Sequence, residues 1–172
     1  MRVMIAAGAI GLFTFTAHAA EVVVPIYSIT ANGMSEQLGT IELRDSADGL
    51  QIRTSLSKLP AGQRGFHVHE NPNCGPAPVD GKPTAGMAAG SHYDPGRTGK
   101  HLGPNGAGHI GDLPALTVDA RGQARTNMTV KRLSVDAIRG RSLMIHGGGD
   151  TYNEPPAAGG GGARIACGVI PK

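Results

Sequence analysis

The sequence predicts an all-β protein, an eight-stranded antiparallel Greek-key β-sandwich or barrel with two long functional loops. Apolar and polar residues alternate along several short segments, as half-buried antiparallel strands require, and no segment has a convincing amphipathic helical pattern. Glycine-rich turns separate these segments, and short strands joined by such turns indicate a sandwich or barrel. About 152 residues follow the N-terminal segment, which suits a single domain.

Eight segments are expected to form strands, namely 22–29, 39–43, 50–56, 65–69, 115–118, 124–130, 142–146 and 164–170. The alternation is clearest in the third, where LQIRTSL places an apolar residue at every second position but one. The sequences DSADG at 45–49 and DARG at 119–122 have the composition of hairpin turns. Pro25 predicts an edge or bulged position in the first strand, because proline cannot donate a hydrogen bond to a neighbouring strand.

The first nineteen residues have the pattern of a secretory signal peptide. One basic residue precedes an apolar stretch, and the small-x-small triplet AHA follows at 17–19. The stretch is shorter than the roughly 20 apolar residues of a membrane-spanning helix, which argues against an anchor. We therefore expect cleavage after Ala19 or Ala20, an exported mature domain of residues 20–172, and no membrane partner.

The charge pattern gives little indication of a nucleic-acid partner. Without the N-terminal segment the chain carries 15 basic and 13 acidic residues, a net charge of +2. The basic residues are scattered, the densest groups being Lys131-Arg132 and Arg139 with Arg141, and no aromatic residues are interleaved with them. Nucleic-acid binding is therefore not expected.

Two segments, 70–114 and 147–163, are long, rich in glycine and proline, and without a strand pattern. Loops of this length inside a compact domain are usually functional, and their composition buries too little apolar surface to order them. Bound metal and a disulfide would order them. In an exported chain the two cysteines, Cys74 and Cys167, are most simply a disulfide, which would stabilise the fold by roughly 4–5 kcal/mol in the chain-entropy model. The alternative, that both thiols bind metal, lacks a Cys-x-x-Cys pair to support it.

All six histidines beyond the signal segment fall into a pattern of metal ligands. Residues two apart on a strand face the same way, so His67 and His69 can present two imidazoles to one metal, and His146 ends another predicted strand. Taken singly, the His-x-His pair and His146 are each more often ordinary strand histidines than metal ligands. The first long loop adds three histidines and an aspartate, a set that completes a closed four-coordinate zinc shell; they are His92, His101, His109 and Asp112.

These segments resemble the bacterial copper/zinc superoxide dismutases over essentially the whole mature chain. The sequence GFHVHENPNCG at 65–75 is similar to the copper-site segment of that family, and AAGSHYDP at 88–95 through GHIGDLP at 108–114 is similar to its zinc loop. The C-terminal signature is matched by MIH at 144–146 and GGGGARIACGVI at 159–170. The resemblance implies a sandwich fold and an enzyme that converts two superoxide anions into dioxygen and hydrogen peroxide.

The resemblance also implies a role for each ligand position. One copper ion would be held by His67, His69, His92 and His146, and one zinc ion by His92, His101, His109 and Asp112. The His92 imidazolate would bridge both metals and carry a proton in catalysis. Asp150 would link His67 to His101 by hydrogen bonds, Arg164 would attract the anionic substrate beside copper, and Cys74 and Cys167 would form the disulfide.

Other interpretations remain open at this stage. The main alternative is a non-catalytic periplasmic copper/zinc carrier or buffer, which would have no use for Arg164. A copper-only enzyme would not need the zinc set, and a binding sandwich with structural metals would not need a redox site. The sequence leaves a homodimer open. We further expect Lys82, Arg97 or Lys100 to help steer superoxide, because the 147–163 loop carries only Asp150 and Glu154 as charges.

Overall fold

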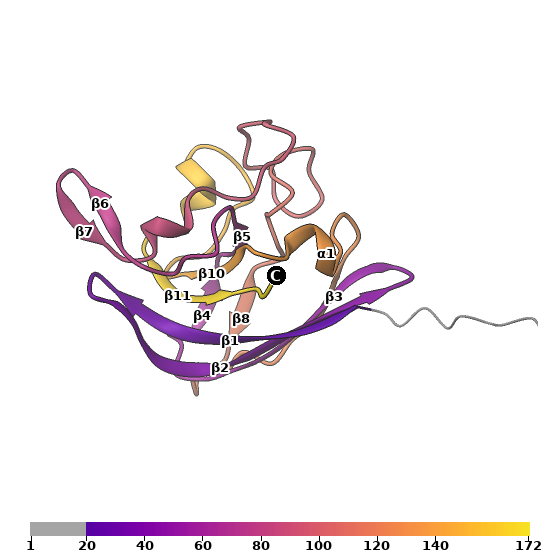
Figure 1. The fold of residues 1–172 in the computed structure, drawn as a ribbon, viewed down its shortest axis with the longest axis horizontal. Coiled ribbons are helices and arrows are strands. Elements are labelled where there is room, and N and C mark those ends of the chain that lie inside the picture. The colour runs from indigo at the N-terminus through magenta and orange to yellow at the C-terminus, as the bar shows by residue number, and fades with distance from the viewer. Residues whose placement is uncertain (1–19) are drawn as a thin grey trace, which may run out of the picture.

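In the computed structural model of the protein, residues 20–172 are described, so the expected signal peptide lies outside the described part. The eight expected strands all form. Numbered as in Figure 1, where β9 carries no label, they are β1 (Glu21–Thr30), β2 (Gly33–Ser46), β3 (Gly49–Leu56), β5 (Phe66–His69), β8 (Leu116–Val118), β9 (Asn127–Val130), β10 (Ser142–His146) and β11 (Arg164–Val169). No helix among residues 20–172 is long and apolar enough to span a membrane.

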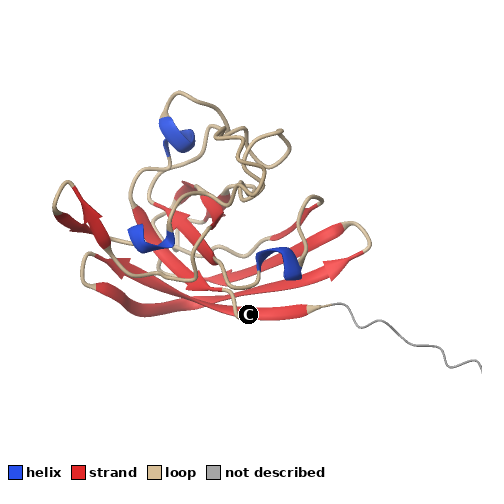
Figure 2. Cartoon of the chain, turned by 45° about the horizontal axis from the view of Figure 1, so that its top comes forward, coloured by secondary structure: helices blue, strands red, loops and turns tan. Residues whose placement is uncertain are grey.

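Seven of the strands form one antiparallel sheet in the order β5-β10-β11-β1-β2-β3-β9. The sheet curls so that the long strands β1, β2 and β3 form one layer and β5, β10 and β11 lie over them (Figures 1 and 2). Apolar side chains from both layers fill the space between, including Ile41, Leu43, Ile52, Phe66 and Leu143. The strand β3 shows why the sequence folds this way, since its even-numbered residues 50–56 are buried and its odd-numbered ones between are exposed.

Three strands were not expected. The strand β4 (Gly62–Arg64) pairs with β8 and leads through Gly65 into β5. The strands β6 (Ala77–Val79) and β7 (Lys82–Thr84) form a hairpin inside the first long loop, and a 3-10 turn, η1 (Met87–Ala89), follows them. The expectation of a loop without structure over 70–114 was therefore wrong in this part. The other helical pieces are one turn of α-helix, α1 (Val135–Ile138), and a second 3-10 turn, η2 (Ala157–Gly160).

Two local expectations are refined. The first strand is central, and Pro25 lies in regular register opposite Thr40, so the expected edge or bulged position was wrong for this residue. The register shift comes just after it, between Ile26 and Tyr27. The DSADG turn joins β2 and β3 as a hairpin, with Ser46 opposite Gly49. Asp119 does begin a tight turn, but β8 pairs with β4 and β9 pairs with β3, so the strands on either side of it are not a hairpin.

Candidate metal centre

The strand β5 supplies two of the predicted copper ligands. Its alternation sends Phe66 and Val68 into the core and places His67 and His69 on the opposite face, where the two long loops cover them, so that all four are buried. The ring of His67 pairs through Nε2 with Asp150 Oδ2 at 2.7 Å, and His69 Nδ1 lies 2.9 Å from the carbonyl oxygen of Gly90.

The other two predicted copper ligands come from β10 and from the first long loop. His146 ends β10, lies opposite Arg164 of β11, and has its Nδ1 3.2 Å from Gly162 O. An isolated bridge sets His92 beside His69, and Tyr93 N donates to Val68 O at 2.8 Å, which fastens the loop to β5. The ligand atoms of the four histidines lie within 4.8 Å of one another, and all four residues are buried.

The predicted zinc ligands gather around Asp112. Its Oδ1 lies 2.9 Å from His92 Nδ1 and 3.4 Å from His109 Nδ1, and its Oδ2 lies 3.1 Å from His101 Nδ1. A second group whose ligand atoms all lie within 4.8 Å of one another is His67, His92, His101 and Asp112. His67 enters this group because its ring stacks on His92 at a centroid distance of 3.9 Å, whereas His109 stands slightly farther out. The two ligand sets are thus adjacent and meet at His92.

Unpartnered nitrogens show that these residues fit metal ions. In His67, His69 and His146 one ring nitrogen is engaged as described above, while the other is buried without a hydrogen-bond partner. The Nδ1 atoms of His101 and His109 are also buried and make no hydrogen bond, although each lies near a carboxylate oxygen of Asp112. Buried polar atoms are rarely left so in folded proteins. Five imidazole nitrogens converging in this way are the donor set that copper and zinc prefer.

The protonation states suit the same purpose. Burial lowers the pKa of His67 to about 4, against a raising hydrogen bond from Asp150, and burial lowers the pKa of His146 to about 3. Burial also lowers the pKa values of His69 and His92. For Asp112 burial acts to raise the pKa, but the His92 hydrogen bond and the neighbouring histidines outweigh it and lower the pKa. Neutral imidazoles and an ionised carboxylate are the ligand forms that metals require.

Asp150 connects the two ligand sets. Its Oδ1 lies 2.8 Å from His101 Nε2, opposite the contact with His67, and also accepts a hydrogen bond from Tyr152 N at 2.8 Å. Burial acts to raise the pKa of Asp150, yet the hydrogen bonds from His67, Tyr152 and His101 lower it far below its ordinary value. Only glycine fits at Gly159, where a Cβ atom would stand 2.1 Å from Asp150 Oδ1.

Arg164 is held beside the histidines by two backbone carbonyls. Its Nη1 donates to Gly86 O and its Nη2 to Gly90 O, both at 2.8 Å, and Gly90 O also lies against His69. Burial lowers the pKa of Arg164, and the guanidinium remains charged. Sequence reasoning missed these carbonyls, because a backbone acceptor has no signature in the sequence.

A hollow of about 500 Å³ opens above the histidines. His92, His146 and Arg164 line it, and Glu154 contributes the other charged side chain. The predicted steering residues Lys82, Arg97 and Lys100 do not line this hollow. Steering acts over distance, so their role stays a prediction.

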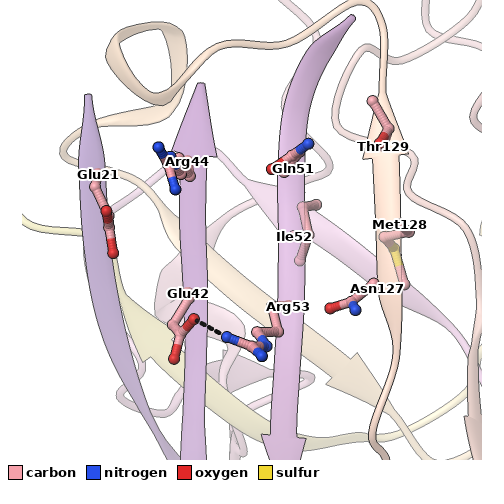
Figure 3. A pocket seen from close by; sticks show the side chains of 9 residues that line it. All are labelled: Glu21, Glu42, Arg44, Gln51, Ile52, Arg53, Asn127, Met128 and Thr129. Atoms are coloured by element: carbon pink, nitrogen blue, oxygen red, sulfur yellow. Dashed lines mark hydrogen bonds and ion pairs between the residues drawn. The ribbon is translucent and has the colours of Figure 1, made fainter. Parts of the chain in front are cut away.

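The outer face of the sheet carries a second hollow, of about 430 Å³, across β1, β2, β3 and β9 (Figure 3). Its lining contains neither histidine nor cysteine, and Glu42 pairs with Arg53 at 3.3 Å across it. This face lacks the convergent unpartnered atoms of the histidine cluster, so we place the site at the histidines.

The predicted disulfide is present. Cys74 and Cys167 are bonded, with Cα atoms 5.6 Å apart, and pack with Ile29, Ala89 and Met144. No free cysteine remains in the described part of the chain. The interpretation of the two thiols as metal ligands is therefore wrong. The bond fastens the first long loop to β11, next to the strand that carries His146.

Comparisons with known proteins agree with this geometry. The sequence model of the family described as "Copper/zinc superoxide dismutase (SODC)" matches residues 37–170. The chain is 44% identical to the "Superoxide dismutase [Cu-Zn]" of Brucella abortus over 172 residues, 99% of each chain. It resembles the solved structure of the Brucella abortus Cu/Zn superoxide dismutase with a TM-score of 0.86 and 45% identity, over 88% of this chain and 99% of that one. The solution structure of a monomeric copper, zinc superoxide dismutase from Salmonella enterica gives a TM-score of 0.78 at 45% identity, with the same coverage.

Proposed function

The chain belongs to the copper/zinc superoxide dismutase family, and on that premise we propose how its own residues divide the work. The protein is an oxidoreductase that converts two superoxide anions and two protons into dioxygen and hydrogen peroxide, with copper and zinc as cofactors. We assign copper to His67, His69, His92 and His146, and zinc to His92, His101, His109 and Asp112. The convergence of unpartnered imidazole nitrogens carries this assignment.

The redox chemistry is supplied by bound copper, which alternates between Cu(II) and Cu(I), while zinc has a single oxidation state. The protein residues bind, orient and guide. Asp150 accepts the Nε2 hydrogens of His67 and His101, which turns the Nδ1 lone pairs of both rings toward the metal positions. Gly90 O acts in the same way on His69. The ligand geometry is therefore set before metal arrives.

His92 is the residue placed to hold and release a proton. Its Nδ1 faces Asp112, so Nε2 is the atom left for the group formed with His67, His69 and His146. The hollow that it lines gives a small anion access to this nitrogen. We propose that Nε2 gives one of the two protons that peroxide formation consumes, the other coming from solvent, while Asp112 fixes the ring from the other side.

Arg164 is proposed to bind the incoming anion. Its guanidinium lies in the wall of the hollow, and its two carbonyl partners leave the positive charge unpaired by any carboxylate in the interactions of the described residues. A fixed cation in a cleft raises the local concentration of an anionic substrate. Superoxide is such a substrate, whereas a metal carrier would gain nothing from this charge.

The test of the function is superoxide dismutation by copper- and zinc-loaded protein, with the metal-free protein as control. We expect fast, cyanide-sensitive turnover that disappears with the metals. Full metal occupancy without turnover would contradict the enzyme and favour the copper/zinc carrier.

We also propose that residues 1–19 are a signal peptide, that residues 20–172 are the single mature domain, and that this domain is periplasmic. Mass spectrometry of the exported protein should show an N-terminus at residue 20 or 21. The oligomeric state is a separate prediction: the relative from Salmonella enterica is described as monomeric, and sedimentation of this protein would distinguish a monomer from a homodimer.

A further inference from the structure

The pair Lys131-Arg132 is one of the two densest basic groups in the sequence, but it does not form a basic surface patch. Lys131 is exposed, whereas Arg132 is half-buried and turned toward the first long loop. The guanidinium donates from Nη1 to Gly106 O at 2.6 Å and from Nη2 to His109 O at 3.2 Å. These two hydrogen bonds connect the turn between β9 and α1 to the first long loop.

The loop segment that Arg132 contacts, residues 100–112, contains three of the four proposed zinc ligands. It has little apolar packing of its own, and Leu102 is 40% exposed. Its folding depends on hydrogen bonds instead: His109 N donates to Lys100 O at 2.9 Å, and Gly103 N donates to Asp112 Oδ2 at 3.2 Å. At its C-terminal end the segment is bonded to β5, where Val68 N donates to Gly111 O at 2.9 Å. Arg132 adds a second connection to the sandwich, at Gly106 and His109.

Both carbonyl groups that Arg132 contacts lie at or near one proposed zinc ligand, His109. One belongs to His109 itself, whose Nδ1 lies 3.4 Å from Asp112 Oδ1, and the other to the bend three residues before it. A planar guanidinium can hold two acceptors in a fixed relation, which a lysine ammonium cannot. The Nε of Arg132 is buried without a hydrogen-bond partner. An unpaired buried donor lowers the free energy of unfolding, so fold stability alone does not explain this arrangement.

We propose that Arg132 is a positioning residue for zinc: it sets the backbone of His109 so that the zinc ligands are in place before the ion binds. This inference rests on the zinc ligands assigned above. Residues that orient metal ligands from outside typically change metal affinity by about 10- to 100-fold when removed. We expect Arg132→Ala to lower zinc affinity by about that factor and to leave copper affinity within about threefold, because no copper-only ligand touches Arg132.

The experiment titrates metal-free wild type, R132A, R132K and the exposed neighbour variant K131A with Zn²⁺ against a chelator, and separately with Cu²⁺. Co²⁺ provides a second probe, since its visible spectrum reports the geometry of the zinc position. The order expected for zinc affinity is wild type and K131A, then R132K, then R132A. The Co²⁺ spectrum of R132A should change, and its copper EPR spectrum should not.

The outcomes separate this inference from the function on which it rests. Wild type that binds no zinc at this position would overturn the ligand assignment itself. Zinc affinity of R132A within threefold of wild type, or an equal loss of copper and zinc, would overturn the positioning role alone. Should R132A fail to fold, R132K decides, because it must bind zinc at least about fivefold more weakly than K131A with unchanged copper binding.

Discussion

Replacing Asp150 by asparagine tests the connection between the two metal positions. The Asp150 side chain is fully buried and accepts from His67 Nε2 at 2.7 Å and from His101 Nε2 at 2.8 Å. Asparagine has nearly the same shape but a single acceptor oxygen, so its amide can satisfy one ring and must direct an N–H group at the other. The variant therefore loses one hydrogen bond to a charged acceptor and leaves one buried donor unpaired.

A hydrogen bond to a charged group contributes about 1.5–3 kcal/mol, which corresponds to about 10- to 150-fold in a binding constant. We expect D150N to bind at least one of the two metals more weakly by this factor, since the freed ring no longer presents Nδ1 in a fixed direction. Chelator competition with Zn²⁺ and with Cu²⁺ measures both affinities. D48N, at an exposed turn between β2 and β3, is the matched control.

The result that refutes this reasoning is a D150N protein that binds both metals within about threefold of wild type. In that case the rings of His67 and His101 would be held by packing alone, and the unpartnered nitrogens would not depend on Asp150 for their direction.

Three further outcomes are expected. Arg164→Ala should lower kcat/KM for superoxide by about tenfold or more. Because Glu154 is then the charged side chain left in the hollow, added salt should raise the rate of this variant. Pulse radiolysis that finds the wild-type salt dependence would contradict this expectation. Serine at both Cys74 and Cys167 should lower the free energy of unfolding by about 2–5 kcal/mol, and an unchanged urea midpoint would show that the bond is not needed for stability. The metal-free protein should lose stability as pH falls from 6.5 toward 4: the pKa of His67 is about 4 in the folded protein against an ordinary 6.5, so the unfolded chain binds more protons in this window. His67 alone corresponds to about 3 kcal/mol, and thermal unfolding independent of pH between 7 and 4.5 would refute it.

Strands such as β3 were predictable because their burial repeats every two residues. In β5 all four residues are buried, but their side chains alternate in direction: Phe66 and Val68 enter the core, and His67 and His69 face the metal centre. The β6–β7 hairpin was not predictable from the sequence, because Pro78 and Pro83 argue against strands. In the structure the two prolines lie opposite each other in a two-stranded ribbon. Each strand of such a ribbon is paired on one side only, so it needs fewer of the backbone N–H donors that proline lacks.

The side chains of the site were predictable from residue type and spacing, but their supports were not. The carbonyls of Gly86 and Gly90 hold Arg164, and the carbonyls of Gly106 and His109 receive Arg132. Backbone oxygens occur at every residue, so only the folded loops distinguish these from the rest. The positions that a sequence pattern cannot supply are those where long loops meet the sandwich.

In the proposed assignment two different metals share His92. The measurement that tests it most directly is anomalous diffraction from crystals of the copper- and zinc-loaded protein, recorded on both sides of each metal's absorption edge. We expect one copper peak within bonding distance of His67, His69, His92 and His146, and one zinc peak within bonding distance of His92, His101, His109 and Asp112. A single metal position, or either peak away from His92, would contradict it.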